Sequence, residues 1–156
     1  MNNAFDYDKA MADIDQRIAV LRRYRHMLES QRKDLVSYLN VIDVRDHAVR
    51  DGDMEVLEAC TVQEQNLVDS LLTLQQCVEP LRLLFQRVQP EGAPEIIELE
   101  TRLTRLRDEI LRRNDESTAL LKAHAADLKL EISKLRATSV PENTWAASAS
   151  IINIQA

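Results

Sequence analysis

The chain has 156 residues, of which 45% are hydrophobic, 29% charged and 4% aromatic, and its formal net charge is −6. Two glycines and four prolines are too few for the turns of a sheet protein, so we expect an all-α fold. The acidic balance argues against nucleic acid as a partner, because binding to phosphates draws on cationic side chains.

The sequence contains no apolar run near the roughly 18 to 20 residues of a membrane-spanning helix. Its first residues also lack a basic region followed by an apolar one, so we expect no secretion signal and predict a cytoplasmic location. Cys60 and Cys77 would lie about 25 Å apart on one helix and could not form a disulfide. We interpret them as buried or idle thiols.

The first helical pattern covers residues 6 to about 50 and contains neither glycine nor proline. A helix of this length would measure about 60 Å, so it must pack beside something equally long. Its apolar residues recur every seven positions, with others between them: Ile14, Leu21, Leu28, Leu35, Ile42 and Val49, then Ile18, Tyr24 and Leu39.

A turn at Asp51-Gly52-Asp53 follows, where Gly52 suits a left-handed backbone and Asp53 can cap the next helix. The second helix has an apolar stripe and is expected to kink or split at Pro80, because proline removes a backbone donor. The stripe consists of Leu57, Cys60, Leu67, Leu71, Leu74 and Val78.

Charge favours an antiparallel hairpin of these two helices. Residues 51–81 contain acids and no Lys or Arg, whereas residues 17–33 are mainly basic. A turn at Gly52 would place Glu79 near Arg23 and Arg25. Exposed ion pairs contribute at most about 1 kcal/mol each, so they would select the register more than stabilise the fold.

The third helix is predicted from Pro94, which suits a first helical turn, to about Arg136. Its first apolar stripe is expected to bury against the hairpin and comprises Ile96, Leu99, Leu103, Leu106 and Ile110. Arg113, Asn114 and Ser117 interrupt the stripe. It then resumes in a second set, which we predict binds a partner: Leu120, Leu121, His124, Leu128, Ile132 and Leu135.

Residues 138–156 lack helical periodicity and carry no charge after Glu142. We therefore predict two parts, a helical bundle over 1–137 and a flexible tail over 138–156. Trp145 and the run 151–154 are apolar enough to add a strand or to dock in a groove.

No phosphate-binding loop, nucleophile elbow, Cys-x-x-Cys pair or Glu-x-x-His motif occurs, so we expect neither an enzyme nor a cofactor. One cluster could offer ligands to a metal ion, with Asp43 and His47 one turn apart near Asp46, Asp51 and Asp53. The favoured interpretation is a solvated helix end with capping acids, since turns select the same residues.

From about Met27 onward the chain resembles flagellar export chaperones of the FlgN family. The resemblance covers about 110 residues and includes Leu28 to Leu35 and the span Val49 to Leu57. It includes further residues of the second and third helices: Glu64, Leu67, Leu71, Leu74, Leu103, Leu106, Ile110, Asn114, Leu120, Leu121 and Leu128.

The resemblance implies a cytoplasmic chaperone of type III secretion. Such a protein would bind hook-associated proteins of the hook–filament junction through its C-terminal helical region and prevent their premature assembly or degradation. The export gate is a further candidate partner, and a monomer or weak homodimer is expected. The alternative is a structural coiled-coil or adaptor protein that self-associates through the same stripe and has no secreted client.

Overall fold

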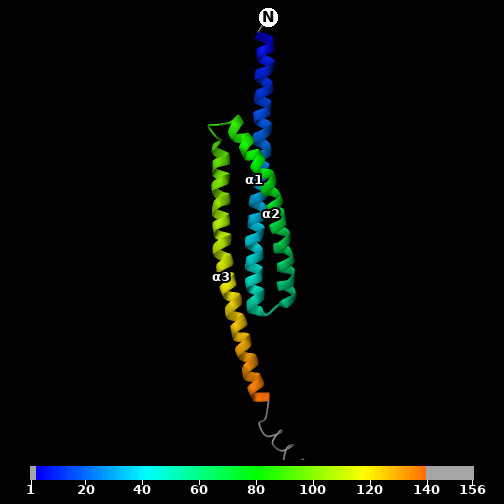
Figure 1. The fold of residues 1–156 in the computed structure, drawn as a ribbon, viewed down its shortest axis with the longest axis vertical. Helices are drawn as coiled ribbons and strands as arrows, with labels where there is room; N and C mark the ends of the chain where they lie inside the picture. Colours follow the sequence, from blue (N-terminus) through cyan, green and yellow to red (C-terminus); the bar gives the residue numbers. More distant parts are fainter. Residues whose placement is uncertain (1–2, 140–156) are drawn as a thin grey trace, which may run out of the picture. The chain divides into compact units, whose positions relative to one another are not determined.

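The structure, a computed structural model, describes residues 3–139. This part of the chain consists of three helices and no strand: α1 (Asn3–Asp51), α2 (Met54–Val88) and α3 (Pro94–Ser139), as Figure 1 shows. The all-α prediction is therefore confirmed. The chain divides into two compact units, Met1–Thr118 and Ala119–Ala156, so that α3 begins in the first and continues in the second.

Within the first unit, α1 and α2 form an antiparallel hairpin (Figure 1). Gly52 has a φ of +72°, the left-handed conformation that glycine adopts without strain. The carboxylate of Asp53 accepts a hydrogen bond of 3.1 Å from the amide of Val56 and so caps α2. Further along the hairpin, the Ser70 hydroxyl donates to Asp34 at 2.6 Å, which agrees with a register set by the turn.

The expected split of α2 at Pro80 is absent, and Glu79 forms its ion pair with a residue other than the predicted Arg23 and Arg25. Pro80 lies inside α2 without splitting it, because its exposed position lets water replace the lost helical hydrogen bond. Glu79 pairs with Arg82 of its own helix at 2.5 Å, and Arg25 pairs with Glu95 of α3 at 3.1 Å. A pair three residues apart on one helix forms without ordering a second element, so it competes well with a pair between helices.

The loop after α2 leads directly into α3. Gly92 has a φ of +75°, and the carbonyl of Ala93 accepts hydrogen bonds from Ile96 at 3.0 Å and Ile97 at 3.1 Å. Pro94 is the first residue of α3, as predicted, because the first helical turn needs no donor there.

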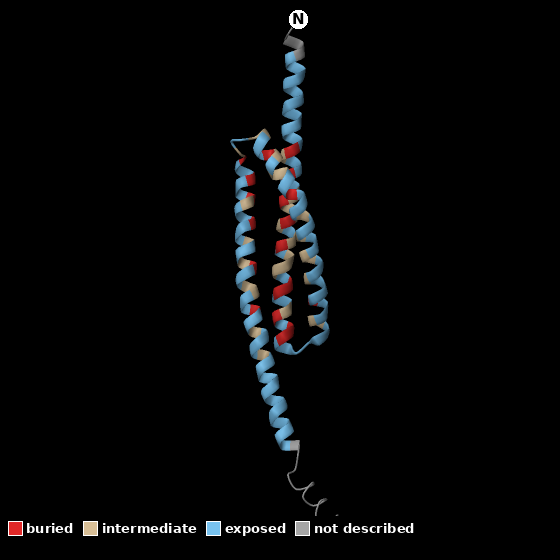
Figure 2. Ribbon diagram, viewed as in Figure 1, coloured by how far each residue is buried: buried red, intermediate tan, exposed pale blue. Residues whose placement is uncertain are grey.

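The core of the first unit lies between the hairpin and the first half of α3, where buried residues face one another (Figure 2). The rings of Tyr24 and Phe85 have their centroids 5.3 Å apart and join α1 to α2. The buried cluster comprises Val20, Tyr24, Leu28, Leu35, Ile42, Val78, Phe85, Ala93, Ile96, Leu99, Leu103 and Ile110.

The first turns of α1 do not belong to this core. Every residue from 6 to 19 is exposed, and burial begins at Val20 (Figure 2). Ile14 and Ile18, which begin the predicted seven-residue repeat, are 48% and 41% exposed. The expectation that the whole of α1 packs along its length is therefore wrong, because α2 and the loop after it end near the level of Tyr24.

Thr138 and Ser139, the first residues of the predicted tail, belong to α3, and the rest of that segment lies outside the described residues. Between residues 3 and 139, no helix has the length and apolar character needed to cross a membrane.

Candidate functional site: the apolar face at the end of α3

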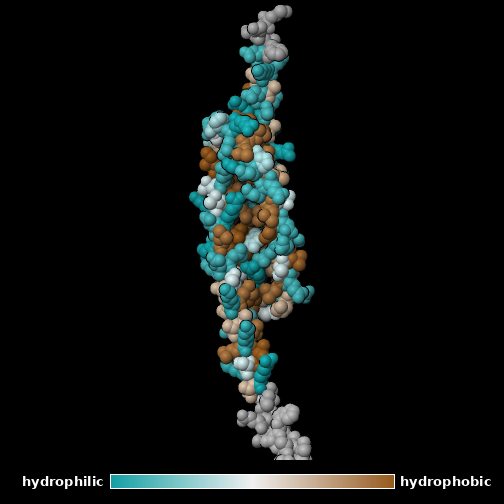
Figure 3. All heavy atoms as spheres, in the orientation of Figure 1, coloured by the Kyte–Doolittle hydropathy of each residue, from teal (hydrophilic) through white to brown (hydrophobic). Residues whose placement is uncertain are grey.

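The six residues predicted to bind a partner all lie on α3 in the second unit. Four of them are exposed: Leu121 at 40%, Leu128 at 47%, Ile132 at 49% and Leu135 at 67%. Leu120 and His124 are half-buried. Figure 3 shows apolar side chains at the surface of this part of α3. These four apolar side chains are therefore available for contact with another molecule.

Five of the six residues share one face of the helix. At about 100° per residue, Leu121, His124, Leu128, Ile132 and Leu135 lie within roughly 80° of one another. Leu120 lies at the edge of this set, next to His124. We call these six residues the α3 apolar face.

Charged residues border the α3 apolar face on both sides. Lys122, Lys129 and Arg136 follow one edge at seven-residue spacing, and Asp127 and Glu131 lie along the other. This arrangement, a narrow apolar stripe between charged edges, is typical of a helix that pairs with a second helix.

Local sequence explains why α3 continues this far. No glycine or proline occurs between Glu95 and Ser139, and alanines with high helix propensity fill residues 123, 125 and 126. The hydroxyls of Ser133 and Thr138 donate to carbonyls of their own helix, Leu130 at 2.7 Å and Lys134 at 3.1 Å. The stretch therefore keeps its helical form while its apolar face is exposed.

A buried polar network marks the last contact of α3 with the hairpin in the first unit. Ser117 has no exposed surface, and its hydroxyl donates a hydrogen bond to Asp46 of α1. The same oxygen accepts hydrogen bonds from Arg45 at 2.7 and 3.2 Å. Arg45 also pairs with Glu64 of α2, so one guanidinium connects all three helices.

Two further residues of α3 complete this network. Asn114 accepts a hydrogen bond of 3.3 Å from Arg45, and Arg113 pairs with Asp43 and lies 4.0 Å from Asp46. Every buried side-chain nitrogen and oxygen in the described part of the chain has a hydrogen-bond partner. Such a network fixes the register of α3 against α1 and α2, because a shift of one helix along another would leave a buried charge without a hydrogen-bond partner.

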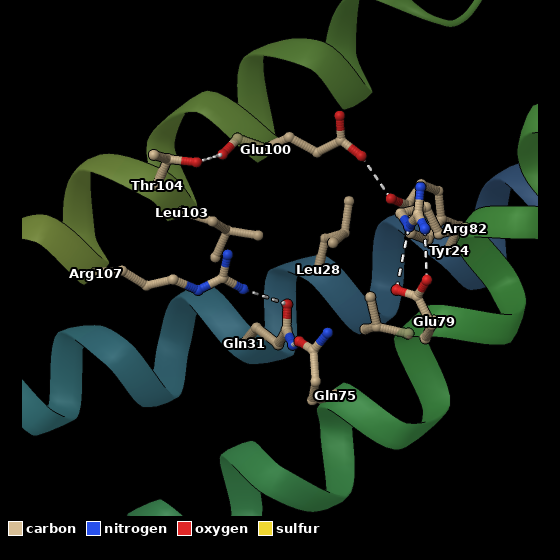
Figure 4. A pocket seen from close by; sticks show the side chains of 11 residues that line it. Tyr24, Leu28, Gln31, Gln75, Glu79, Arg82, Glu100, Leu103, Thr104 and Arg107 are labelled. Carbon is tan, nitrogen blue, oxygen red and sulfur yellow. Dashed lines mark hydrogen bonds and ion pairs between the residues drawn. The ribbon is translucent and has the colours of Figure 1, made fainter.

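A polar cleft of about 270 Å³ lies between the three helices of the first unit, next to Tyr24 and Glu100 (Figure 4). The Tyr24 hydroxyl donates to Glu100 at 2.5 Å, and Gln31 contacts both Gln75 at 3.0 Å and Arg107 at 3.5 Å. Burial, reinforced by the hydrogen bond to Glu100, raises the pKa of Tyr24 well above its ordinary value. These polar groups satisfy one another, so the cleft acts as a polar layer of the bundle.

The acidic residues near the hairpin turn, which could have offered ligands to a metal ion, instead form contacts within the protein. Asp53 caps α2, Asp43 pairs with Arg113, and Asp46 receives the Ser117 hydroxyl. The His47 ring nitrogen Nδ1 lies 2.8 Å from the carbonyl oxygen of Asp43. Within residues 3–139, no three His, Cys, Asp or Glu side chains are placed together to hold a metal ion.

The sequence alone did not identify the buried polar residues, although a signal for them exists. Gln31 and Arg45 follow Tyr24 at intervals of seven and twenty-one residues, which places them on the same helical stripe as that buried ring. Ser117 follows Ile110 by seven residues and continues its stripe in the same way. Following the seven-residue spacing through polar positions would have predicted that Gln31 and Ser117 are buried and that Arg45 is partly buried.

The fold and this surface define a class: an all-α protein in which a helical hairpin packs against a third long helix that carries an exposed apolar face. The chain is similar to an uncharacterized protein of Treponema pallidum (strain Nichols), with 26% identity over 125 residues that cover 80% of each chain. No family model matches the sequence. No solved structure matches it significantly.

Proposed function

We propose that the protein is a non-catalytic, cytoplasmic chaperone of flagellar type III export. It would hold a helix of a hook-associated protein on the α3 apolar face until that client is secreted. The observation that carries the proposal is the exposure of Leu128, Ile132 and Leu135, three large side chains on one face of one helix.

Physical chemistry supports a binding role for this face. Burying a Leu or Ile side chain completely contributes about 1.5–3 kcal/mol, and these residues are about half exposed. A partner helix would therefore gain about 1 kcal/mol at each, less the cost of ordering both surfaces. An amphipathic client helix with apolar residues at spacings of three and four would fit the face best.

The resemblance to the FlgN family supports the class of client. It rests on the leucine pattern of the hairpin and of α3, including Asn114 among repeating leucines. Asn114 is joined to Arg45 in the polar network, directly before the exposed face begins. The export gate remains a second candidate partner on the same ground.

The second candidate function is a structural coiled-coil or adaptor protein that self-associates through the α3 apolar face. The charged edges at seven-residue spacing favour it, because coiled-coil partners use such edges to select each other. A tight dimer without affinity for any client would support this function, and a client-binding monomer or weak dimer would support the chaperone.

The direct test measures binding of purified hook-associated proteins from the same organism, and of peptides covering their C-terminal helices. The double variant Leu128→Gln with Ile132→Gln removes the centre of the face and should weaken binding at least about tenfold. Leu130→Gln is the matched control, because Leu130 is 54% exposed on the opposite side of the same helix. Equal loss in both variants, or no binding by the wild type, would contradict the proposal.

A second measurement tests the client class inside cells. The protein is captured from its own cells, and the flagellar axial proteins that accompany it are quantified with wild-type and doubly substituted α3. Selective loss of one hook-associated protein with Leu128→Gln and Ile132→Gln supports the proposal. Recovery of the same proteins with both forms would contradict it.

A further inference from the structure

The first turns of α1 carry a second exposed apolar face. Tyr7 is 67% exposed, Met11 43%, Ile14 48% and Ile18 41%. At about 100° per residue these four side chains lie within roughly 60° of one another. We call them the α1 apolar face, and neither the fold of the first unit nor the proposed function uses them.

The charges around the two apolar faces are opposite. Residues 6–18 contain four carboxylates and two cations, a net charge of −2, with Asp8 and Asp15 along one edge. Residues 119–138 contain four cations and two carboxylates, a net charge of +2, with Lys122 and Lys129 along one edge. Two α1 stretches, each with a net charge of −2, would therefore repel each other, whereas one α1 stretch and one α3 stretch attract.

The two faces also match in length. The stretch from Tyr7 to Ile18 rises about 17 Å, and the stretch from Leu121 to Leu135 rises about 21 Å. Each has its apolar residues at steps of three and four, which lets the side chains of one helix fit between those of another. Charge and length thus both indicate residues 119–138 as the helix that fits the α1 apolar face.

We propose that the α1 apolar face binds a second copy of this chain through that copy's residues 119–138. The two helices run antiparallel, so that Tyr7, Met11 and Ile18 pack on Ile132, Leu128 and Leu121 of the other molecule. Asp8 and Asp15 then lie beside Lys129 and Lys122. The contact is short and partly electrostatic, so it is weak, reversible and weakened by salt. It covers the α3 apolar face when no other partner holds it.

Sedimentation of the full chain over a concentration series tests the apolar half of this contact. The variant Ile14→Gln with Ile18→Gln should raise the dissociation constant for self-association at least about tenfold. Gln16→Ala is the control on the opposite, exposed side of the same turns and should leave it unchanged. A wild type that is monomeric up to its solubility limit, or equal effects of both variants, would overturn the proposal.

Charge exchange tests the pairing itself. Two double variants should each fail to self-associate: Asp8→Lys with Asp15→Lys, and Lys122→Glu with Lys129→Glu. In each variant, residues 6–18 and residues 119–138 have net charges of the same sign. An equimolar mixture should regain association, since both contacts are then complementary. Failure of the mixture to associate, with both variants helical by circular dichroism, would overturn the proposal.

The outcome is independent of the proposed chaperone function. Ile14→Gln with Ile18→Gln should leave binding of a hook-associated helix intact, because it changes only the α1 apolar face. A protein that self-associates as described but binds no such client would contradict the chaperone function alone. A client-binding protein that stays monomeric at all concentrations would contradict this inference alone.

Discussion

The Ser117 hydroxyl donates a hydrogen bond to a carboxylate oxygen of Asp46, and thereby joins α3 to α1 across 71 positions of the sequence. Ser117 has no exposed surface, and Asp46 is 8% exposed. Arg45 donates to the same hydroxyl at 2.7 Å, so the serine oxygen lies between a cation and an anion. Ser117 is the last buried side chain of α3, because no residue from 118 to 138 is buried.

Replacing Ser117 with alanine should lower the free energy of unfolding by about 1–3 kcal/mol. The substitution leaves Asp46 and Arg45 each short of a buried hydrogen bond, and an unsatisfied buried polar group costs that much. Urea denaturation followed by circular dichroism measures the change. Ser133→Ala is the matched control and should stay within about 0.5 kcal/mol, because its exposed hydroxyl bonds only to its own helix. Equal stability of the two variants would show that the network contributes little.

Stability should fall above pH 10 because of Tyr24. Burial and the Glu100 hydrogen bond raise the pKa of Tyr24 above the ordinary 10.0, so the folded protein retains this proton longer than the unfolded chain. The contribution is complete below pH 10 and is lost as the pH rises towards the pKa of the folded state. In Tyr24→Phe, the free energy of unfolding should therefore depend less on pH in this range.

Ultraviolet absorbance of tyrosinate provides the independent measurement for Tyr24. One of the three tyrosines should ionise only as the wild-type protein unfolds at alkaline pH, and this phase should be absent from Tyr24→Phe. Ionisation of every tyrosine in the folded wild type near pH 10 would contradict the buried hydrogen bond.

The two cysteines should differ sharply in reactivity. Cys77 is exposed, whereas Cys60 is 4% exposed and burial raises the pKa of its thiol. A thiol-specific chromogenic reagent should therefore modify one cysteine quickly and the second only after denaturant is added. Cys77→Ser should abolish the fast phase and Cys60→Ser the slow one, and the reverse assignment would contradict the packing of α2.

Pro80→Ala should stabilise the protein by about 1–3 kcal/mol. Pro80 lies inside the continuous helix α2, where alanine restores a backbone donor and has far higher helix propensity. Pro90→Ala in the loop is the control and should be neutral or slightly destabilising, since it only loosens the unfolded chain. A lower free energy of unfolding in Pro80→Ala would contradict the expectation that the proline destabilises α2.

The helices and their ends were predictable because local chemistry determines them. Gly52, Asp53 and Pro94 adopt the turn, cap and first-turn roles expected of them. The first stripe of α3 from Ile96 to Ile110 is buried except for Leu106, which is partly buried. These features depend on backbone conformation and on periodicity, which a single sequence displays directly.

Features that depend on how far a neighbouring helix extends were not predictable. The seven-residue repeat continues through Ile14 and Ile18, yet they are exposed because α2 and the loop after it end near the level of Tyr24. The interruption at Arg113 and Ser117 was interpreted as a break in a stripe, whereas Ser117 is the most buried polar residue of the bundle. Its partner Asp46 lies in another helix, and only the packed structure brings the two together.

Hydrogen exchange of the dilute, monomeric protein measures how far residues 119–138 are protected in the isolated chain. We expect amides of residues 119–138 to exchange much faster than those of residues 96–117, because no side chain from 119 to 138 is buried. Addition of a bound client helix should slow exchange across residues 121–135. Protection of residues 119–138 equal to that of residues 96–117 in the isolated monomer would contradict an exposed α3 apolar face that is free to bind a client.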